Sequence, residues 1–137
     1  MANRYRITKK KLATLSLDEF EALYDRFVDE IPEKLCRELN GGFLLLPDTK
    51  KDGEFYIMGE YVEDPVMGCA ILLYYGSFVG LLRDAPREEW EKELFDTAVH
   101  ELRHHLESLA GVDDLVREEM AELEAYILST RRNKYAL

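Results

Sequence analysis

The pattern H-E-x-x-H, formed by His100, Glu101 and His104, is the part of the sequence best suited to chemistry. Residues four apart lie one turn apart on the same face of a helix, so both imidazoles can reach one metal ion. Glu101 lies about 100° around the helix from His100, where it can hold a water molecule rather than bind the ion. A zinc-bound water has a pKa of about 7 and needs a base to take its proton. The pattern therefore predicts a zinc site in which Glu101 is the general base.

Chance is the alternative explanation, because the pattern fixes only three positions. However, all 3 histidines of the chain fall within His100 to His105, which a merely solvated helix face does not require. The segment also carries an apolar stripe, as a helix that presents such a site to a cleft should. We therefore favour a metal site over coincidence.

The third protein ligand of a catalytic zinc is expected among the acidic residues that follow the motif. These are Glu107, Asp113, Asp114, Glu118, Glu119 and Glu122. Glu107 lies on the same rigid helix and should point along its axis, away from the ion. Gly111 lets the chain turn back, which favours Asp113 or Asp114. Glu119 is the other option, because an inward-facing carboxylate needs a metal, a histidine N–H or an arginine.

His105 lies off the face shared by His100 and His104. We expect it to support a ligand or to lie at the surface.

A long helix must position this motif. Asp84 is expected to be its N-cap, Pro86 to lie in its first turn, and Ala110 to be near its end. Its buried stripe is predicted to comprise Phe95, Val99, Leu102, Leu106 and Leu109. A last helix should begin near Asp113 or Asp114.

The first half of the chain predicts further helices and a small sheet. Ser16 and Glu19 form a capping box that starts an amphipathic helix, which Pro32 ends, and a second short helix follows. Residues 43–46, 54–62 and 69–75 read as strands, 48–53 as a polar turn, and 78–82 have no clear assignment. The fold class is therefore α+β, with a small mixed sheet of three to four strands packed on the motif helix.

The length of the chain points to one domain over residues 1–137. The net charge is −10, although eight basic residues lie in the two ends, 1–14 and 131–137, which we expect to be loosely ordered. An acidic body argues against nucleic acid as a partner. No apolar run approaches the ~20 residues of a membrane span, and Cys36 and Cys69 read as reduced core residues, so we expect a cytoplasmic protein.

The residues around the motif resemble the small bacterial metallopeptidase-like family of minimal zincins. The resemblance rests on residues 100–111 followed by Asp114-Leu115, on residues 73–78 and on residues 38–42, and it covers roughly residues 17–125. It implies a stripped-down metalloprotease core that binds Zn²⁺. The related pattern H-E-x-x-H-x-x-G-x-x-D assigns the third ligand to Asp114, although this chain has three extra residues before Gly111.

The sequence thus predicts a zinc-dependent metallopeptidase that hydrolyses a peptide or protein substrate. The strand that ends at Tyr74 and Tyr75 is expected to bind an extended substrate at the sheet edge, with a tyrosine near the oxyanion, unless both rings only fill the core or the cleft wall. Two alternatives remain: a metal-binding domain with vestigial activity that acts as an interaction or regulatory module, and a domain without metal whose motif is coincidental.

Overall fold

The computed structural model describes residues 14–109 and 116–134, with side chains in 14–109 and 118–130. In chain order the elements are α2 (Leu17–Glu30), the 3-10 helix η1 (Glu33–Cys36), β1 (Gly42–Leu46), β2 (Lys50–Asp52), β3 (Phe55–Ile57), β4 (Gly59–Asp64), β5 (Gly68–Tyr74), α3 (Tyr75–Leu82), α4 (Arg87–Leu109) and α5 (Val116–Lys134).

Three strands form a small mixed sheet in the order β1-β5-β4. β1 runs parallel to β5, whereas β4 pairs with β5 in the antiparallel direction. The predicted α+β class is confirmed, and the sheet has three strands. Because β5 is central, the open edges of the sheet belong to β1 and β4.

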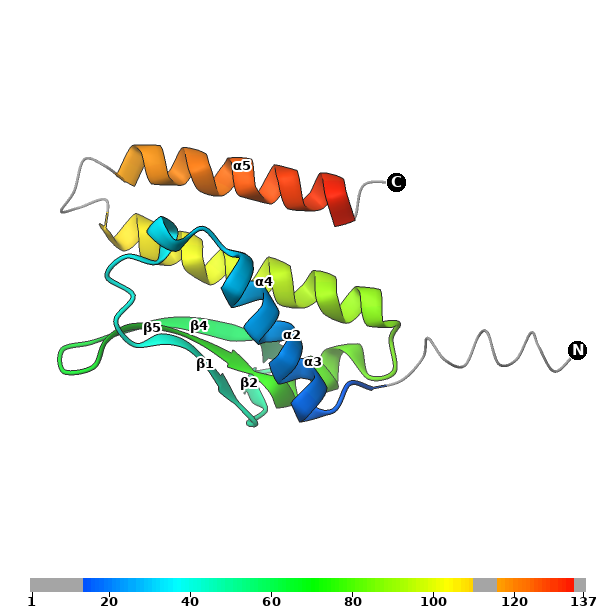
Figure 1. Cartoon of the computed structure of the whole chain (residues 1–137). Helices are drawn as coiled ribbons and strands as arrows, with labels where there is room; N and C mark the ends of the chain where they lie inside the picture. The colour runs from blue at the N-terminus through cyan, green and yellow to red at the C-terminus, as the bar shows by residue number, and fades with distance from the viewer. Residues whose placement is uncertain (1–13, 110–115, 135–137) are drawn as a thin grey trace, which may run out of the picture.

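α2, α4 and α5 lie on one side of this sheet, and α3 follows at the end of β5 (Figure 1). α4 lies over the sheet, α2 crosses beside it, and α5 packs on the side of α4 that faces away from the strands. The core between these layers holds the predicted stripe of α4, of which Leu102 and Leu106 are fully buried, together with Trp90 and Phe20. Burial of this stripe is what orients α4 about its own axis.

The capping box predicted at the start of α2 is present. The Ser16 hydroxyl accepts the amide N–H of Glu19 at 3.1 Å, and the Glu19 carboxylate accepts the amide of Ser16 at 2.8 Å. These bonds satisfy two of the amide groups that a helix start leaves without partners.

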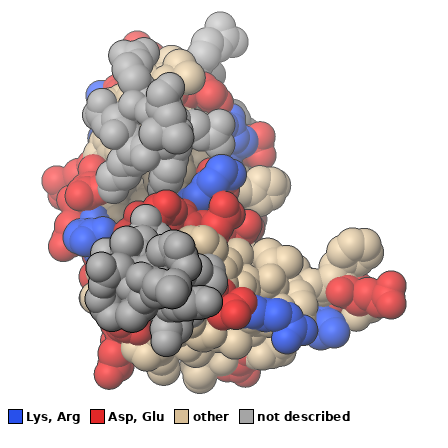
Figure 2. Space-filling model, turned by 90° about the vertical axis from the view of Figure 1, so that its right-hand side faces the viewer, with Lys and Arg blue, Asp and Glu red and all other residues tan. Residues whose placement is uncertain are grey.

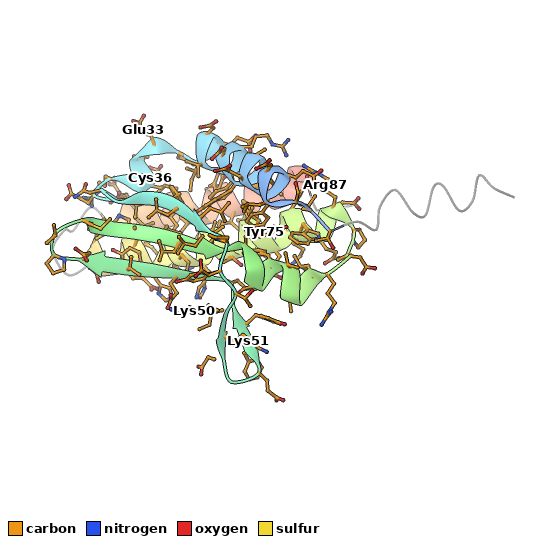
Figure 3. All side chains as sticks on the ribbon, turned by 90° about the horizontal axis from the view of Figure 1, so that it is seen from below. Glu33, Cys36, Lys50, Lys51, Tyr75 and Arg87 are labelled. Atoms are coloured by element: carbon orange, nitrogen blue, oxygen red, sulfur yellow. The ribbon has the colours of Figure 1, made fainter. Side chains whose placement is uncertain are left out.

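β2 and β3 form a separate two-stranded hairpin that projects from the body, as Figure 3 shows beside Lys50 and Lys51. The predicted polar turn at 48–53 therefore contains a strand, and the predicted strand 54–62 is interrupted at Met58. Alternation alone does not reveal such a break, because β3 pairs with β2 while β4 joins the main sheet.

The strand predicted over 69–75 ends at Tyr74, and Tyr75 already begins α3, which also contains the unassigned residues 78–82. Gly76 permits this change of direction, because its amide donates to the Asp48 carbonyl at 3.0 Å and a Cβ there would lie 2.8 Å from the same oxygen.

Two helix boundaries differ from expectation. α4 begins at Arg87, so Asp84 is not its N-cap, and the amides of Glu89 and Trp90 donate to the carbonyl of Pro86. α5 extends to Lys134 and so includes part of the end predicted to be loosely ordered. Residues 1–13 and 135–137, the rest of the basic ends, lie outside the described residues.

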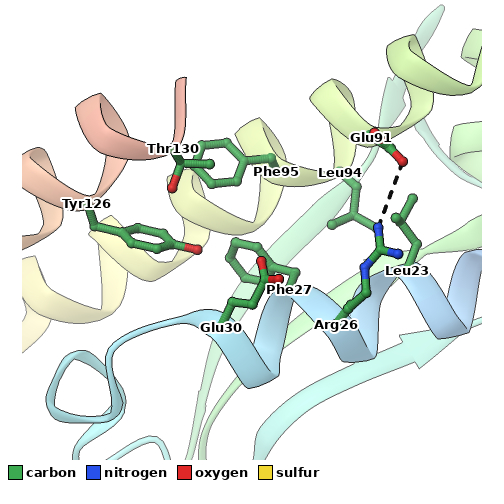
Figure 4. A pocket seen from close by; sticks show the side chains of 9 residues that line it. All are labelled: Leu23, Arg26, Phe27, Glu30, Glu91, Leu94, Phe95, Tyr126 and Thr130. Carbon is green, nitrogen blue, oxygen red and sulfur yellow. Dashed lines mark ion pairs between the residues drawn. The ribbon is translucent and has the colours of Figure 1, made fainter. Parts of the chain in front are cut away.

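A small cavity lies where α2, α4 and α5 meet (Figure 4). Its volume of ≈ 30 Å³ suits a water molecule rather than an organic ligand. Arg26 and Glu91 form an ion pair of 3.9 Å at its side. This cavity is therefore a packing feature rather than a candidate binding site.

On the face drawn in Figure 2, Asp and Glu side chains are spread widely, with Lys and Arg side chains between them rather than gathered in one basic patch. Among the described helices, none is long and apolar enough to span a bilayer. Cys36 and Cys69 are free thiols.

Candidate metal and catalytic site

His100 and His104 lie together on the exposed face of α4. Their Nε2 atoms are 3.1 Å apart, and the ring planes are almost perpendicular, at 86°. The Nδ1 atom of His104 lies 3.4 Å from a carboxylate oxygen of Glu107. A proton held on Nδ1 by that carboxylate leaves the lone pair of Nε2 free for a cation.

Glu101 lies on the side of α4 that faces β4 and is only 8% exposed. Its carboxylate accepts a hydrogen bond from the main-chain N–H of Tyr61. Burial raises the pKa of this carboxyl, while the nearby His100 and His104 oppose the rise. A carboxylate with a raised pKa is a stronger base than an exposed one, as proton transfer from water requires.

The strand beside this carboxylate, β4, lies at an edge of the sheet. Tyr74 donates its amide to Met58 at 2.9 Å, and in an antiparallel pair such bonded positions alternate with unbonded ones. The register therefore turns the main-chain groups of Gly59, Tyr61 and Glu63 away from β5, toward the open edge.

Gly59 allows β4 to approach α4 closely. A Cβ at this position would lie 3.0 Å from the Thr97 methyl group on α4 and 2.8 Å from the Leu72 carbonyl oxygen. A larger residue would push the strand away from the helix and separate the edge from Glu101.

Two hollows flank Glu101 along this edge. One, of ≈ 720 Å³, extends past His104, and its lining includes Tyr61, Ser108 and the acidic residues Glu60, Glu63 and Glu107. The other, of ≈ 380 Å³, extends past His100, and its lining includes Ile57, Glu93 and Asp96. Together they form a groove along β4 that is open enough for an extended chain.

The structure does not bring Glu119 to the histidines. Glu119 is 6% exposed, and each of its carboxylate oxygens accepts a bond of 2.8 Å from Arg37. Of the three partners that an inward carboxylate can take, it has the arginine. Asp113 and Asp114 lie outside the described residues, and within those residues no group of three His, Cys, Asp or Glu side chains is placed to share a metal ion.

His105 is fully buried rather than at the surface. Its Nδ1 lies 2.9 Å from the Tyr61 hydroxyl, and its Nε2 lies 2.7 Å from the Arg37 carbonyl oxygen. Sequence reasoning missed this role, although His105 lies seven residues after Ala98 and three after Leu102, in register with the apolar stripe. That spacing is the signal that could have indicated its burial.

The two tyrosines predicted to bind substrate, Tyr74 and Tyr75, lie in different surroundings, and neither is at an open edge of the sheet. The Tyr74 hydroxyl donates to Glu60 at 2.6 Å. Tyr74 lies on β5, which is the central strand and so cannot pair with a further strand. The Tyr75 hydroxyl donates to the Leu15 carbonyl at 2.5 Å, and its ring packs against Phe20, away from the histidines. The open edge near the motif belongs to β4 instead.

No protein-family model matches the chain, and no curated protein matches it. A solved structure of a conserved hypothetical protein from Thermo thermophilus is similar to it, with a TM-score of 0.63 and 35% sequence identity. The match covers 72% of this chain and 100% of that one. At this identity and coverage, the chain belongs to the same family as the conserved Thermo thermophilus protein.

Proposed function

We propose that this protein is a zinc-dependent hydrolase of peptide bonds, in which His100 and His104 hold the ion and Glu101 is the general base. The observation that carries the proposal is the convergence of the two Nε2 atoms to 3.1 Å beside a buried carboxylate and an open strand edge. This combination is what we expect of a minimal zincin-like core.

The two imidazoles fit a zinc ion. Two nitrogen ligands at the usual zinc distance and tetrahedral angle are about 3.3 Å apart, close to the separation of these Nε2 atoms. The Glu107 carboxylate near Nδ1 of His104 is the kind of outer partner that zinc-bound histidines usually have. Asp114, the residue to which the resemblance assigns the role, is our proposed third ligand, and Glu119 is already paired with Arg37.

A bound zinc ion supplies a Lewis acid for the substrate carbonyl and a water molecule with a pKa of about 7. The protein's part is to move protons: Glu101 takes the proton of the attacking water and later gives it to the leaving amine. Burial suits Glu101 to this role, because it raises the pKa of the carboxyl above that of an exposed glutamate.

The substrate would lie along β4 in an extended conformation. Its main chain would pair with the open main-chain groups at Gly59 and Glu63, which is the usual way in which a peptide adds to a sheet edge. This pairing would place a peptide bond beside Glu101 and the two histidines without a deep pocket.

The proposal is tested by metal content and peptide cleavage with protein that carries no His-tag. The variants are His100→Ala/His104→Ala, Glu101→Gln, and Glu88→Gln as a matched control on the exposed first turn of α4. We expect about one zinc per chain in all but the double variant. Cleavage of a peptide library should persist in Glu88→Gln and fall at least ~100-fold in Glu101→Gln.

Two outcomes would contradict it. Absence of zinc after incubation with micromolar zinc would remove the metal site and leave a coincidental motif. Zinc bound through the two histidines, without cleavage of any library peptide, would show a metal-binding domain with vestigial activity that serves as an interaction or regulatory module.

A further inference from the structure

We infer that His105 and Tyr61 are positioning residues that hold the β4 edge and the Glu101 carboxylate in a fixed relation to α4. The Arg37 carbonyl, the His105 ring and the Tyr61 hydroxyl form a continuous hydrogen-bonded chain, which we call the relay. Its catalytic consequence rests on the function proposed above, whereas its geometric consequence does not.

The hydrogen-bond partners fix the tautomer of His105. A carbonyl oxygen only accepts, so Nε2 must carry the proton and donate to Arg37 over 2.7 Å. The other ring nitrogen, Nδ1, faces the Tyr61 hydroxyl inside the core. Nδ1 then bears a lone pair and accepts the Tyr61 O–H over 2.9 Å.

Tyr61 is thereby attached to α4 at two points. Its hydroxyl donates to His105, and its main-chain N–H donates to the carboxylate of Glu101. Glu101 and His105 are four residues apart and so lie one above the other on the same helix face. One residue of the edge strand is therefore fixed against two successive turns of the motif helix.

This attachment matters because nothing stronger orients Glu101. Among the described residues, no Lys or Arg bonds to its carboxylate, and the N–H of Tyr61 is its hydrogen-bond donor. If the Tyr61 side chain loses its anchor, the strand can shift along or away from α4, and the carboxylate loses its donor. The simpler reading is a core histidine that only satisfies its own two nitrogens.

Four single variants separate these readings. Tyr61→Phe removes only the hydroxyl. His105→Gln can keep the bond to Arg37 but loses the acceptor for Tyr61, whereas His105→Asn can keep that acceptor and loses the donor. Tyr75→Phe is the matched control, because it removes one half-buried tyrosine bond, to Leu15, on a part of the fold away from the histidines.

The first measurement is amide hydrogen exchange in metal-free protein. We expect the amide of residue 61 to exchange roughly tenfold faster in Tyr61→Phe and in His105→Gln than in the Tyr75→Phe control, with a smaller difference in His105→Asn. The second is kinetics of the zinc-loaded protein, in which the same two variants should lose about tenfold in kcat. KM and the zinc Kd should stay within about threefold, because neither histidine ligand belongs to the relay.

Each result decides a separate point. If the amide of residue 61 exchanges no faster in Tyr61→Phe and His105→Gln than in the Tyr75→Phe control, the relay is overturned, whatever the activity. Faster exchange with kcat unchanged overturns the positioning role. Faster exchange in a protein whose wild type neither binds zinc nor cleaves peptides supports the relay and rejects the proposed function. If His105→Gln fails to fold, the exchange and kinetics of Tyr61→Phe, which keeps the aromatic ring at position 61, decide the question alone.

Discussion

Glu101 and Glu119 are both buried carboxylates, 8% and 6% exposed, yet their surroundings differ. Glu119 on α5 receives two bonds of 2.8 Å from the guanidinium of Arg37. Glu101 on α4 has a main-chain N–H from Tyr61 and no Lys or Arg bonded to it among the described residues, and burial raises its pKa. One charge is compensated inside the protein, and the other is not.

This difference separates a structural carboxylate from one available for chemistry. A buried charge is costly unless it is paired, so Glu119 has its cost offset by a bidentate partner. Glu101 keeps lone pairs for a ligand and lies between two hollows of a groove. Burial of a carboxylate is therefore not enough to indicate a site; the missing partner is what indicates it.

The largest effect on stability should come from Glu119→Gln. Removal of the carboxylate leaves the Arg37 guanidinium without its bidentate partner, and because Arg37 is about one-third exposed we expect a loss of about 2 kcal/mol rather than the full cost of a buried ion. Glu101→Gln should change the stability of the metal-free protein by less than about 1 kcal/mol, or raise it, since no strong partner is lost. Urea unfolding measures both.

Glu122→Gln is the matched control on α5, since its partner Lys34 is well exposed and should contribute little. If Glu101→Gln destabilised the protein as much as Glu119→Gln, both carboxylates would be structural, and Glu101 would not be the one available for chemistry.

An apolar replacement of the whole pair should restore most of that loss. In Arg37→Met/Glu119→Leu no charge remains without a partner, and such exchanges often leave stability within about 1 kcal/mol of the original. Arg37→Met alone should be destabilising, because it leaves Glu119 buried and charged. A double-mutant cycle checks this. If the double variant lost as much unfolding free energy as the two single variants together, the pair would not be energetically coupled.

The parts of this molecule that depend on local spacing could be predicted from the sequence. The capping box of Ser16 and Glu19 involves residues three apart, and the pair His100 and His104 involves residues four apart on one helix. In both cases the helix period determines the geometry. The α+β class followed from the same local patterns.

The parts that depend on topology could not be predicted from the sequence. The groove exists because β4 is an edge strand, and the order β1-β5-β4 is not written in any single segment. Glu119 bonds to Arg37, which lies 82 residues away in the sequence, and His105 bonds to Tyr61, which lies 44 residues away. The sequence showed that Glu119 needed a partner but could not choose among those available, because the choice depends on how α5 packs near η1.

The same contrast applies to the hydroxyls of Tyr24, which is buried, and Tyr75, which is half-buried, and it predicts a smaller effect. The Tyr24 hydroxyl is buried without a hydrogen-bond partner among the described residues, whereas the Tyr75 hydroxyl donates to the Leu15 carbonyl. Tyr24→Phe should therefore leave stability unchanged or raise it by up to about 1 kcal/mol, and Tyr75→Phe should lower it by about 1 kcal/mol. Thermal unfolding of the two variants side by side checks this, and equal losses would mean that Tyr24 has a partner.

The smallest effect should appear at Glu60, a half-exposed carboxylate with partners. The Lys50 ammonium at 2.5 Å and the Tyr74 hydroxyl at 2.6 Å lower the pKa of Glu60 below its ordinary value. The folded state therefore favours the ionised form, and its stabilisation is complete above the unfolded pKa of about 4.3 and is lost as the pH falls through the lower folded value.

The free energy of unfolding of wild type should accordingly exceed that of Glu60→Gln by less than about 1 kcal/mol near neutral pH, because water competes for an exposed pair. The excess should vanish in acid, which a series of urea titrations from pH 7 to about pH 3 would measure. A difference independent of pH would mean that the bonds of Glu60 do not depend on its charge. If the difference does fade, Glu60 resembles Glu119 in having its partner within the protein, and exposure to water accounts for the smaller size of its effect.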